Sequence, residues 1–227
     1  MKENDTYDLS NVDPDDISEI LQKVEKSFHI QFKYRELESV KNFGELCDII
    51  EHKVNGIQSE ACATQQAYYR IREAIALVQE IDKVSITLES KIEDLFPRHD
   101  RNKKIRALQQ QLGIAFDILS MQAWFSWLIA GGVIGSLLFF FFQWQVAVTG
   151  ILFFIAIGRL AGKFFSKELQ LNTVRQLTEK LSREHYIDLR RDASTINRNE
   201  IAQKVKELFK ADLVLEDHLL TREATFS

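Results

Sequence analysis

The chain has 227 residues, 45% of them hydrophobic and 27% charged, which allows one or two domains with a substantial core. Its formal net charge is −4, its isoelectric point is near 5.8, and no run of Lys and Arg is interleaved with aromatic residues, so we expect no nucleic-acid partner. Cys47 and Cys62 form no C-x-x-C pair, which argues against a zinc site or a disulfide framework and predicts two reduced thiols on the cytoplasmic side.

The pattern of apolar residues predicts an all-α protein. Only two prolines and nine glycines interrupt the chain, and apolar positions recur three and four residues apart. The first helix begins with Asp13 as N-cap and Pro14 as first helical residue. Its apolar stripe consists of Ile17, Ile20, Leu21, Val24 and Phe28. Further short amphipathic helices are predicted within residues 40–54, 69–78, 102–112, 173–181 and 200–213, and we expect them to pack with one another because each is too short to be stable alone.

The middle of the chain predicts a transmembrane hairpin over residues 121–167. Residues 123–142 and 146–165 are apolar stretches of about the ~20 residues that cross a bilayer core, joined by the uncharged turn at 143–145. Cationic residues flank both outer ends, so the positive-inside rule predicts an integral membrane protein with two spans in a bacterial inner membrane and both termini cytoplasmic. The residues expected at the membrane interface are Arg101, Lys103, Lys104, Trp144, Arg159 and Lys163.

Glycines in the two stretches are spaced for close helix packing. Gly131 and Gly135, and Gly158 and Gly162, have G-x-x-x-G spacing, which predicts packing within the hairpin or between protomers. A small channel is a further interpretation of the hairpin, but its polar residues are few: Ser126, Ser136 and Thr149.

The start of the first helix resembles a known family. The run Asp13-Pro14-Asp15-Asp16-Ile17-Ser18-Glu19-Ile20 is similar to the second-helix start of acyl carrier proteins, D-S-L-D-x-V-E-L. The following run, VEKSFHIQFKYRELESVKNFGELCDII, resembles that family through its fourth helix. Pro14 stands where the family has the serine that carries phosphopantetheine, so the resemblance implies a unit without a cofactor. It also implies that Asp13, Asp15, Asp16 and Glu19 form a docking face for basic patches on protein partners, the alternative being a merely solvated helix start.

Other parts of the chain resemble the remaining helices of the carrier fold. Residues 196–227 look like a first helix and the loop after it, so a circularly permuted unit is predicted from residues 1–56 completed by 196–227. A second such unit is predicted from residues 66–120 and 170–186, with the hairpin inserted into it. Its serine position falls at about Arg98 or His99, so we expect this unit to hold no cofactor either.

No motif for catalysis or metal binding accompanies this resemblance. The five histidines lack an H-E-x-x-H pair, and no serine lies in a G-x-S-x-G turn. We therefore expect no enzyme activity, no cofactor and no metal, and interpret the chain as a membrane-anchored docking or scaffold module, oligomeric if the C-terminal helix is exchanged between protomers. Its partners would be the lipid bilayer and unidentified proteins. The alternative is a functional carrier or lipid-metabolism accessory protein modified at Ser10 or Ser18.

Overall fold

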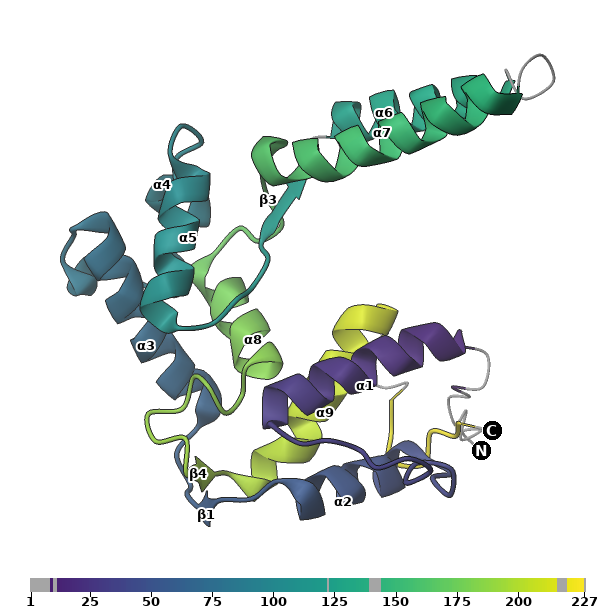
Figure 1. The fold of residues 1–227 in the computed structure, drawn as a ribbon. Coiled ribbons are helices and arrows are strands. Elements are labelled where there is room, and N and C mark those ends of the chain that lie inside the picture. Colours follow the sequence, from purple (N-terminus) through teal and green to yellow (C-terminus); the bar gives the residue numbers. More distant parts are fainter. Residues whose placement is uncertain (1–8, 10–11, 122, 139–143, 216–219, 227) are drawn as a thin grey trace, which may run out of the picture. The chain divides into compact units, whose positions relative to one another are not determined.

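A computed structural model of the chain describes residues 9, 12–121, 123–138, 144–215 and 220–226 (Figure 1). The protein is mostly helical in this part, which confirms the helical character predicted from the apolar periodicity. The helices are α1 (Pro14–Phe28), α2 (Phe43–Lys53), α3 (Ala63–Gln79), the 3-10 turn η2 (Lys83–Ser85), α4 (Ile92–Leu95), α5 (Arg101–Leu112), α6 (Ala123–Leu138), α7 (Trp144–Phe165), α8 (Val174–Glu184) and α9 (Arg198–Leu213).

Two pairs of short strands accompany the helices, and the chain divides into two compact units. Unit 1 comprises Met1–Leu88 and Arg175–Ser227, and unit 2 comprises Glu89–Val174. In unit 1, β1 (Ile57–Gln58) pairs in parallel with β4 (Thr195–Ile196). In unit 2, β2 (Leu119–Met121) pairs antiparallel with β3 (Ser166–Leu169). Unit 1 thus contains residues 66–88 and 175–186, which the sequence assigns to the second carrier-like unit.

The core of unit 1 is assembled from both ends of the chain. Helix α9 packs against α1 and α2, and the backbone N–H of Leu9 donates to the carbonyl of Thr225 at 2.7 Å (Figure 1). Because each helix alone has only one narrow apolar stripe, the three stripes are stabilised by facing one another. Fully buried residues of this core include Ile20, Val24, Phe28, Leu46, Ile50, Val205, Leu208 and Phe209.

The backbone arrangement of α9, α1 and α2 occurs a second time in α3, α5 and α8. Helices α9 and α3 both end in a residue with positive φ, Val214 at 53° and Glu80 at 56°. The segment after each cap makes three backbone hydrogen bonds to the start of another helix. After α9 they are Phe226 N to Lys41 O (3.0 Å), Phe43 N to Ala224 O (2.8 Å) and Gly44 N to Arg222 O (2.8 Å). After α3 they are Ile92 N to Asn172 O (2.9 Å), Val174 N to Ser90 O (3.0 Å) and Arg175 N to Leu88 O (2.8 Å).

The two sets of hydrogen bonds coincide residue by residue. Between the segments that follow α9 and α3, the residue numbers of the bonded residues differ by 134 (226 − 92, 224 − 90, 222 − 88). Between the starts of α8 and α2 they differ by 131 (172 − 41, 174 − 43, 175 − 44). The buried positions of the two copies are related by the same differences in residue number. Residues 43, 46, 47, 50 and 54 are buried in and after α2, as are residues 174, 177, 178, 181 and 185 in and after α8. Residues 201, 205, 208 and 209 of α9 and residues 67, 71, 74 and 75 of α3 correspond likewise.

Helices α1 and α5 also end alike. His29 and Gly113 have φ of 52° and 72°, and the next residue donates its N–H to the carbonyl five residues earlier, at 3.1 Å for Ile30 and 3.3 Å for Ile114. The shift between the two is 84 (113 − 29, 114 − 30), and it places Arg98 at the position that corresponds to Pro14. The structure is therefore internally repeated, with the hairpin inserted before the last helix of the second copy.

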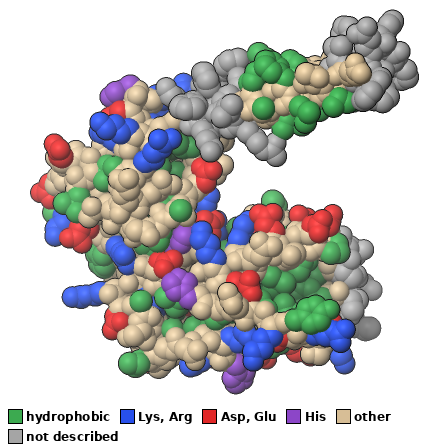
Figure 2. Space-filling view, viewed as in Figure 1, with side chains coloured by type: hydrophobic (Ala, Val, Ile, Leu, Met, Phe, Trp, Pro, Cys, Tyr) green, Lys and Arg blue, Asp and Glu red, His purple; other side chains and the backbone are tan. Residues whose placement is uncertain are grey.

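Helices α6 and α7 pack side by side as a hairpin (Figure 1). Gly132 faces the ring of Phe154 and Gly150 faces the side chain of Ser136, so close that a Cβ at either glycine would clash. Nothing lies within 4 Å of a Cβ built on Gly131 or Gly135, so these two do not mediate packing inside the hairpin. Gly158 and Gly162 lie where the structure describes no side-chain surroundings. Figure 2 shows hydrophobic side chains along the described surface of the hairpin. Exposed hydrophobic residues of the two helices include Trp127 at 78% exposure and Leu152 at 63%.

The prediction of two membrane spans is wrong. Within the described residues, no helix is both long enough and apolar enough to reach across a bilayer. Helix α6 has 16 residues, a rise of about 24 Å at ~1.5 Å per residue against a hydrocarbon core of about 30 Å. The predicted first span included residues 139–142, which lie outside the described part, and α7 contains the cationic Arg159 and Lys163. The localisation as a two-span integral membrane protein with cytoplasmic termini is corrected accordingly.

Candidate functional site

The start of α1 forms an exposed acidic turn. The side chain of Asp13 caps the helix by accepting from the N–H of Asp15 at 2.9 Å, and Pro14, which has no N–H to leave unpaired, occupies the first helical position. The carboxylates are favoured here because they face the positive end of the helix dipole. Asp13, Pro14, Asp15, Asp16, Ser18 and Glu19 are all exposed, whereas Ile20 is buried.

Part of this acidic turn is already paired with α9. Glu19 binds the ammonium of Lys23 at 3.0 Å, and Lys23 also binds Asp212 at 2.8 Å. Partial burial by itself would lower the pKa of Lys23, but its hydrogen bonds to Asp212 and Glu19 raise that pKa above its ordinary value. Asp13, Asp15 and Asp16 therefore supply most of the uncompensated negative charge of the predicted docking face.

Neither copy of the repeated arrangement has a hydroxyl at the position where the resemblance to carrier proteins predicts a serine. In unit 1 the position is Pro14, and in unit 2 it is Arg98, which is exposed and lies 3.7 Å from Glu168. Ser18 is exposed one turn into α1 rather than at its start, and Ser10 lies outside the described residues. His99 is exposed beside Arg98 and lies 3.5 Å from Asp100.

Of the residues predicted at a membrane interface, three have described side chains, and one of these three is buried. Arg101 is only 2% exposed, donates from Nε to the carbonyl of Phe96 at 2.7 Å, and lies 3.7 Å from Glu93. Burial lowers its pKa, and the nearby Glu93 opposes that shift. Lys103 is exposed and Lys104 pairs with Asp100 at 3.4 Å. The side chains of Trp144, Arg159 and Lys163 lie outside the described part.

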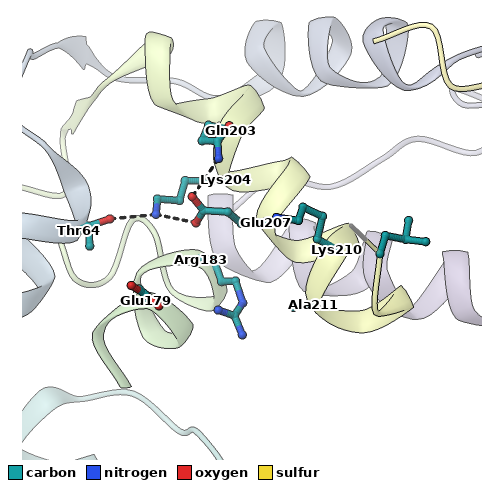
Figure 3. A pocket seen from close by; sticks show the side chains of 9 residues that line it. Thr64, Glu179, Arg183, Gln203, Lys204, Glu207, Lys210 and Ala211 are labelled. Atoms are coloured by element: carbon teal, nitrogen blue, oxygen red, sulfur yellow. Dashed lines mark hydrogen bonds and ion pairs between the residues drawn. The ribbon is translucent and has the colours of Figure 1, made fainter. Parts of the chain in front are cut away.

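A charged pocket in unit 1 was not predicted from the sequence. It has a volume of about 510 Å³ and lies among α8, α9 and the start of α3 (Figure 3). Lys204 projects from the buried stripe of α9 and is itself only 5% exposed. Its ammonium binds Glu207 at 2.8 Å, Thr64 at 2.9 Å and Ser182 at 3.3 Å. The signal in the sequence was a lysine at an otherwise apolar position, next to Val205 and three residues after Ile201.

Two further observations bear on chemistry. Burial raises the pKa of the Cys47 thiol from 9.0 to about 12, so this side chain is a poor nucleophile near neutral pH. Among the residues whose surroundings are described, no three His, Cys, Asp or Glu side chains converge as ligands of a metal ion.

Comparison with protein-family models, with curated protein sequences and with solved structures finds no match to this chain. The candidate site is therefore interpreted from its own geometry.

Proposed function

We propose that the protein is a non-enzymatic docking module made of two degenerate carrier-like units. The observation that carries this proposal is Pro14, exposed in the first turn of α1 among carboxylates and without a hydroxyl to bear a prosthetic group. The repeated hydrogen-bond pattern supports it, because the second copy has Arg98 at the same position and so lacks the hydroxyl as well.

The partner that fits the acidic turn is a protein surface rich in Lys and Arg. Asp13, Asp15 and Asp16 are exposed at one helix end, where charge complementarity steers association and fixes orientation. Such rim charges contribute modestly to affinity, so we expect a transient complex that weakens as salt is raised.

Site-specific photocrosslinking in cells tests the docking proposal. A photoreactive phenylalanine at position 16 should give one intermolecular adduct, and the crosslinked partner peptide should be basic. The same group at Tyr34, which is 89% exposed away from the acidic turn, is the control. The combined variant D13N, D15N and E19Q keeps side-chain size and a good N-cap, and should abolish the adduct. An adduct that survives neutralisation, or appears equally from position 34, would refute the docking face.

Exchange of the C-terminal helix between protomers is a second part of the proposal. Within one chain, α9 packs against α1 and α2, so an exchanged dimer would form the same contacts between two copies. Crosslinking of positions 28 and 208 in a mixture of differently tagged protomers tests whether α9 is exchanged between chains. Products that join the two tags support exchange, and purely intrachain products contradict it.

A further inference from the structure

The charged pocket of unit 1, defined by Arg183, Lys204, Glu207, Lys210 and Glu179, is lined by more positive than negative charge. Three of these side chains are cationic and two are anionic, which leaves a formal charge of +1 (3 − 2). These five side chains come from α8 and α9, and Thr64 of α3 also lines the pocket; all of these residues belong to unit 1. The pocket therefore belongs to one compact unit.

One of the cations is fully engaged within the protein. The ammonium of Lys204 has three hydrogen bonds, to Glu207, Thr64 and Ser182, which use all three of its donors. Figure 3 shows the bonds to Glu207 and Thr64. Its ion pair with Glu207 at 2.8 Å also neutralises that carboxylate. Lys204 and Glu207 thus form a charge-balanced pair in the pocket lining.

Arg183 is different, because its guanidinium has no partner among the described residues. Its Nε is shielded from solvent without a hydrogen bond, and no described carboxylate lies within ion-pair distance of it, although Glu179 lines the same pocket. Outside its own helix, the backbone carbonyl of Arg183 accepts a hydrogen bond from the hydroxyl of Ser27 at 2.6 Å. A shielded donor without an acceptor typically costs about 1–3 kcal/mol, so such a group in an open pocket indicates a missing acceptor.

We propose that this pocket binds an oxyanion, with Arg183 as the principal ligand and Lys210 as a second cation. The planar guanidinium donates parallel N–H groups to the two oxygens of a carboxylate or a phosphate. Lys210 lines the pocket from α9, on the opposite side from α8, and adds a second positive charge (Figure 3). Carboxylates and phosphates share this chemistry, and the ligand class is left to the titrations. The proposal does not depend on the docking face of α1.

Titration of the full chain with inorganic phosphate and with acetate, each at matched ionic strength against chloride, tests the site. Backbone amide signals of α8 and α9 should shift in a saturable way with one of the two anions. The R183Q variant should weaken binding by at least about tenfold, since a hydrogen bond to a charged group contributes about 1.5–3 kcal/mol. The R183K variant, which keeps the charge and loses the fork, should weaken it less.

The matched control is K206Q, which removes one positive charge from α9 at a residue outside the pocket lining, and it should bind as the wild type does. If R183Q does not fold, the anion-dependent rise in melting temperature of R183K compared with the wild type replaces it. Linear, unsaturable shifts with both anions, or equal losses in the variants at 183 and 206, would overturn the proposal.

Discussion

Truncating Phe209 tests whether both chain ends form one cooperative core. The ring is fully buried in α9 and makes edge contacts with Phe43 of α2 (centroids 5.3 Å apart) and with Phe226 near the C-terminus (6.4 Å). Replacing a buried Phe by Ala costs about 3–5 kcal/mol, and two lost aromatic pairs place F209A in the upper part of that range. Since domains are stabilised by about 5–15 kcal/mol, unit 1 should become marginal, with a melting temperature lower by roughly 10–20 °C.

Hydrogen exchange and urea unfolding measure this effect. In F209A, amide protection should fall together in α1, α2 and α9, although α1 precedes α9 by about 180 residues in the chain. The control variant K206A, on the same helix, should change the free energy of unfolding by less than about 0.5 kcal/mol. Protection that is lost only in residues 198–226, while α1 and α2 keep wild-type protection, would refute a shared core.

Three further perturbations have definite expected outcomes. The native chain should react with a thiol reagent at Cys62 and not at Cys47, and both thiols should react in denaturant. Because burial raises the folded pKa of Cys47 to about 12, the free energy of unfolding should be retained below pH 9 and should fall above it by up to about 1.4 kcal/mol per pH unit. The C47A variant should reduce this slope. G132A should destabilise the hairpin, because its Cβ would clash with a phenylalanine ring of α7. G131A should be neutral or stabilising by up to about 1 kcal/mol, because its Cβ meets open space. Circular dichroism melts measure both effects. S27A should lower the free energy of unfolding in urea by about 2–4 kcal/mol, because it leaves the part-buried carbonyl of Arg183 and the buried N–H of Tyr186 without their shared hydroxyl partner. A loss below about 1 kcal/mol would contradict the importance of these two hydrogen bonds.

Local patterns in the sequence predicted the helices well. The first helix begins at Asp13 and Pro14 as expected, and residues 20, 24 and 28 of its stripe are buried. Predicted helices 102–112 and 200–213 correspond to α5 and α9 within two residues at each end. These features depend on capping and on 3.6-residue periodicity, which a single sequence shows directly.

Features that depend on distant residues were not predicted. The pair β1 and β4 has two residues in each strand, too few for an alternating pattern, and it forms only because Ile57 and Thr195 meet in the folded chain. The pocket at Lys204 brings together residues more than a hundred positions apart, such as Thr64. The prediction of two membrane spans came from apolar composition alone, and within the described residues no helix is both long enough and apolar enough to cross a bilayer.

The intact mass of the full chain after incubation with coenzyme A and a phosphopantetheinyl transferase tests the central claim most directly. The wild type should keep its mass, because neither Pro14 nor Arg98 offers a hydroxyl. The P14S variant, which restores the hydroxyl in a turn still capped by Asp13, should gain one phosphopantetheine. A gain in the wild type, or a folded P14S variant that stays unmodified, would contradict the account of a carrier-like unit that has lost its attachment site.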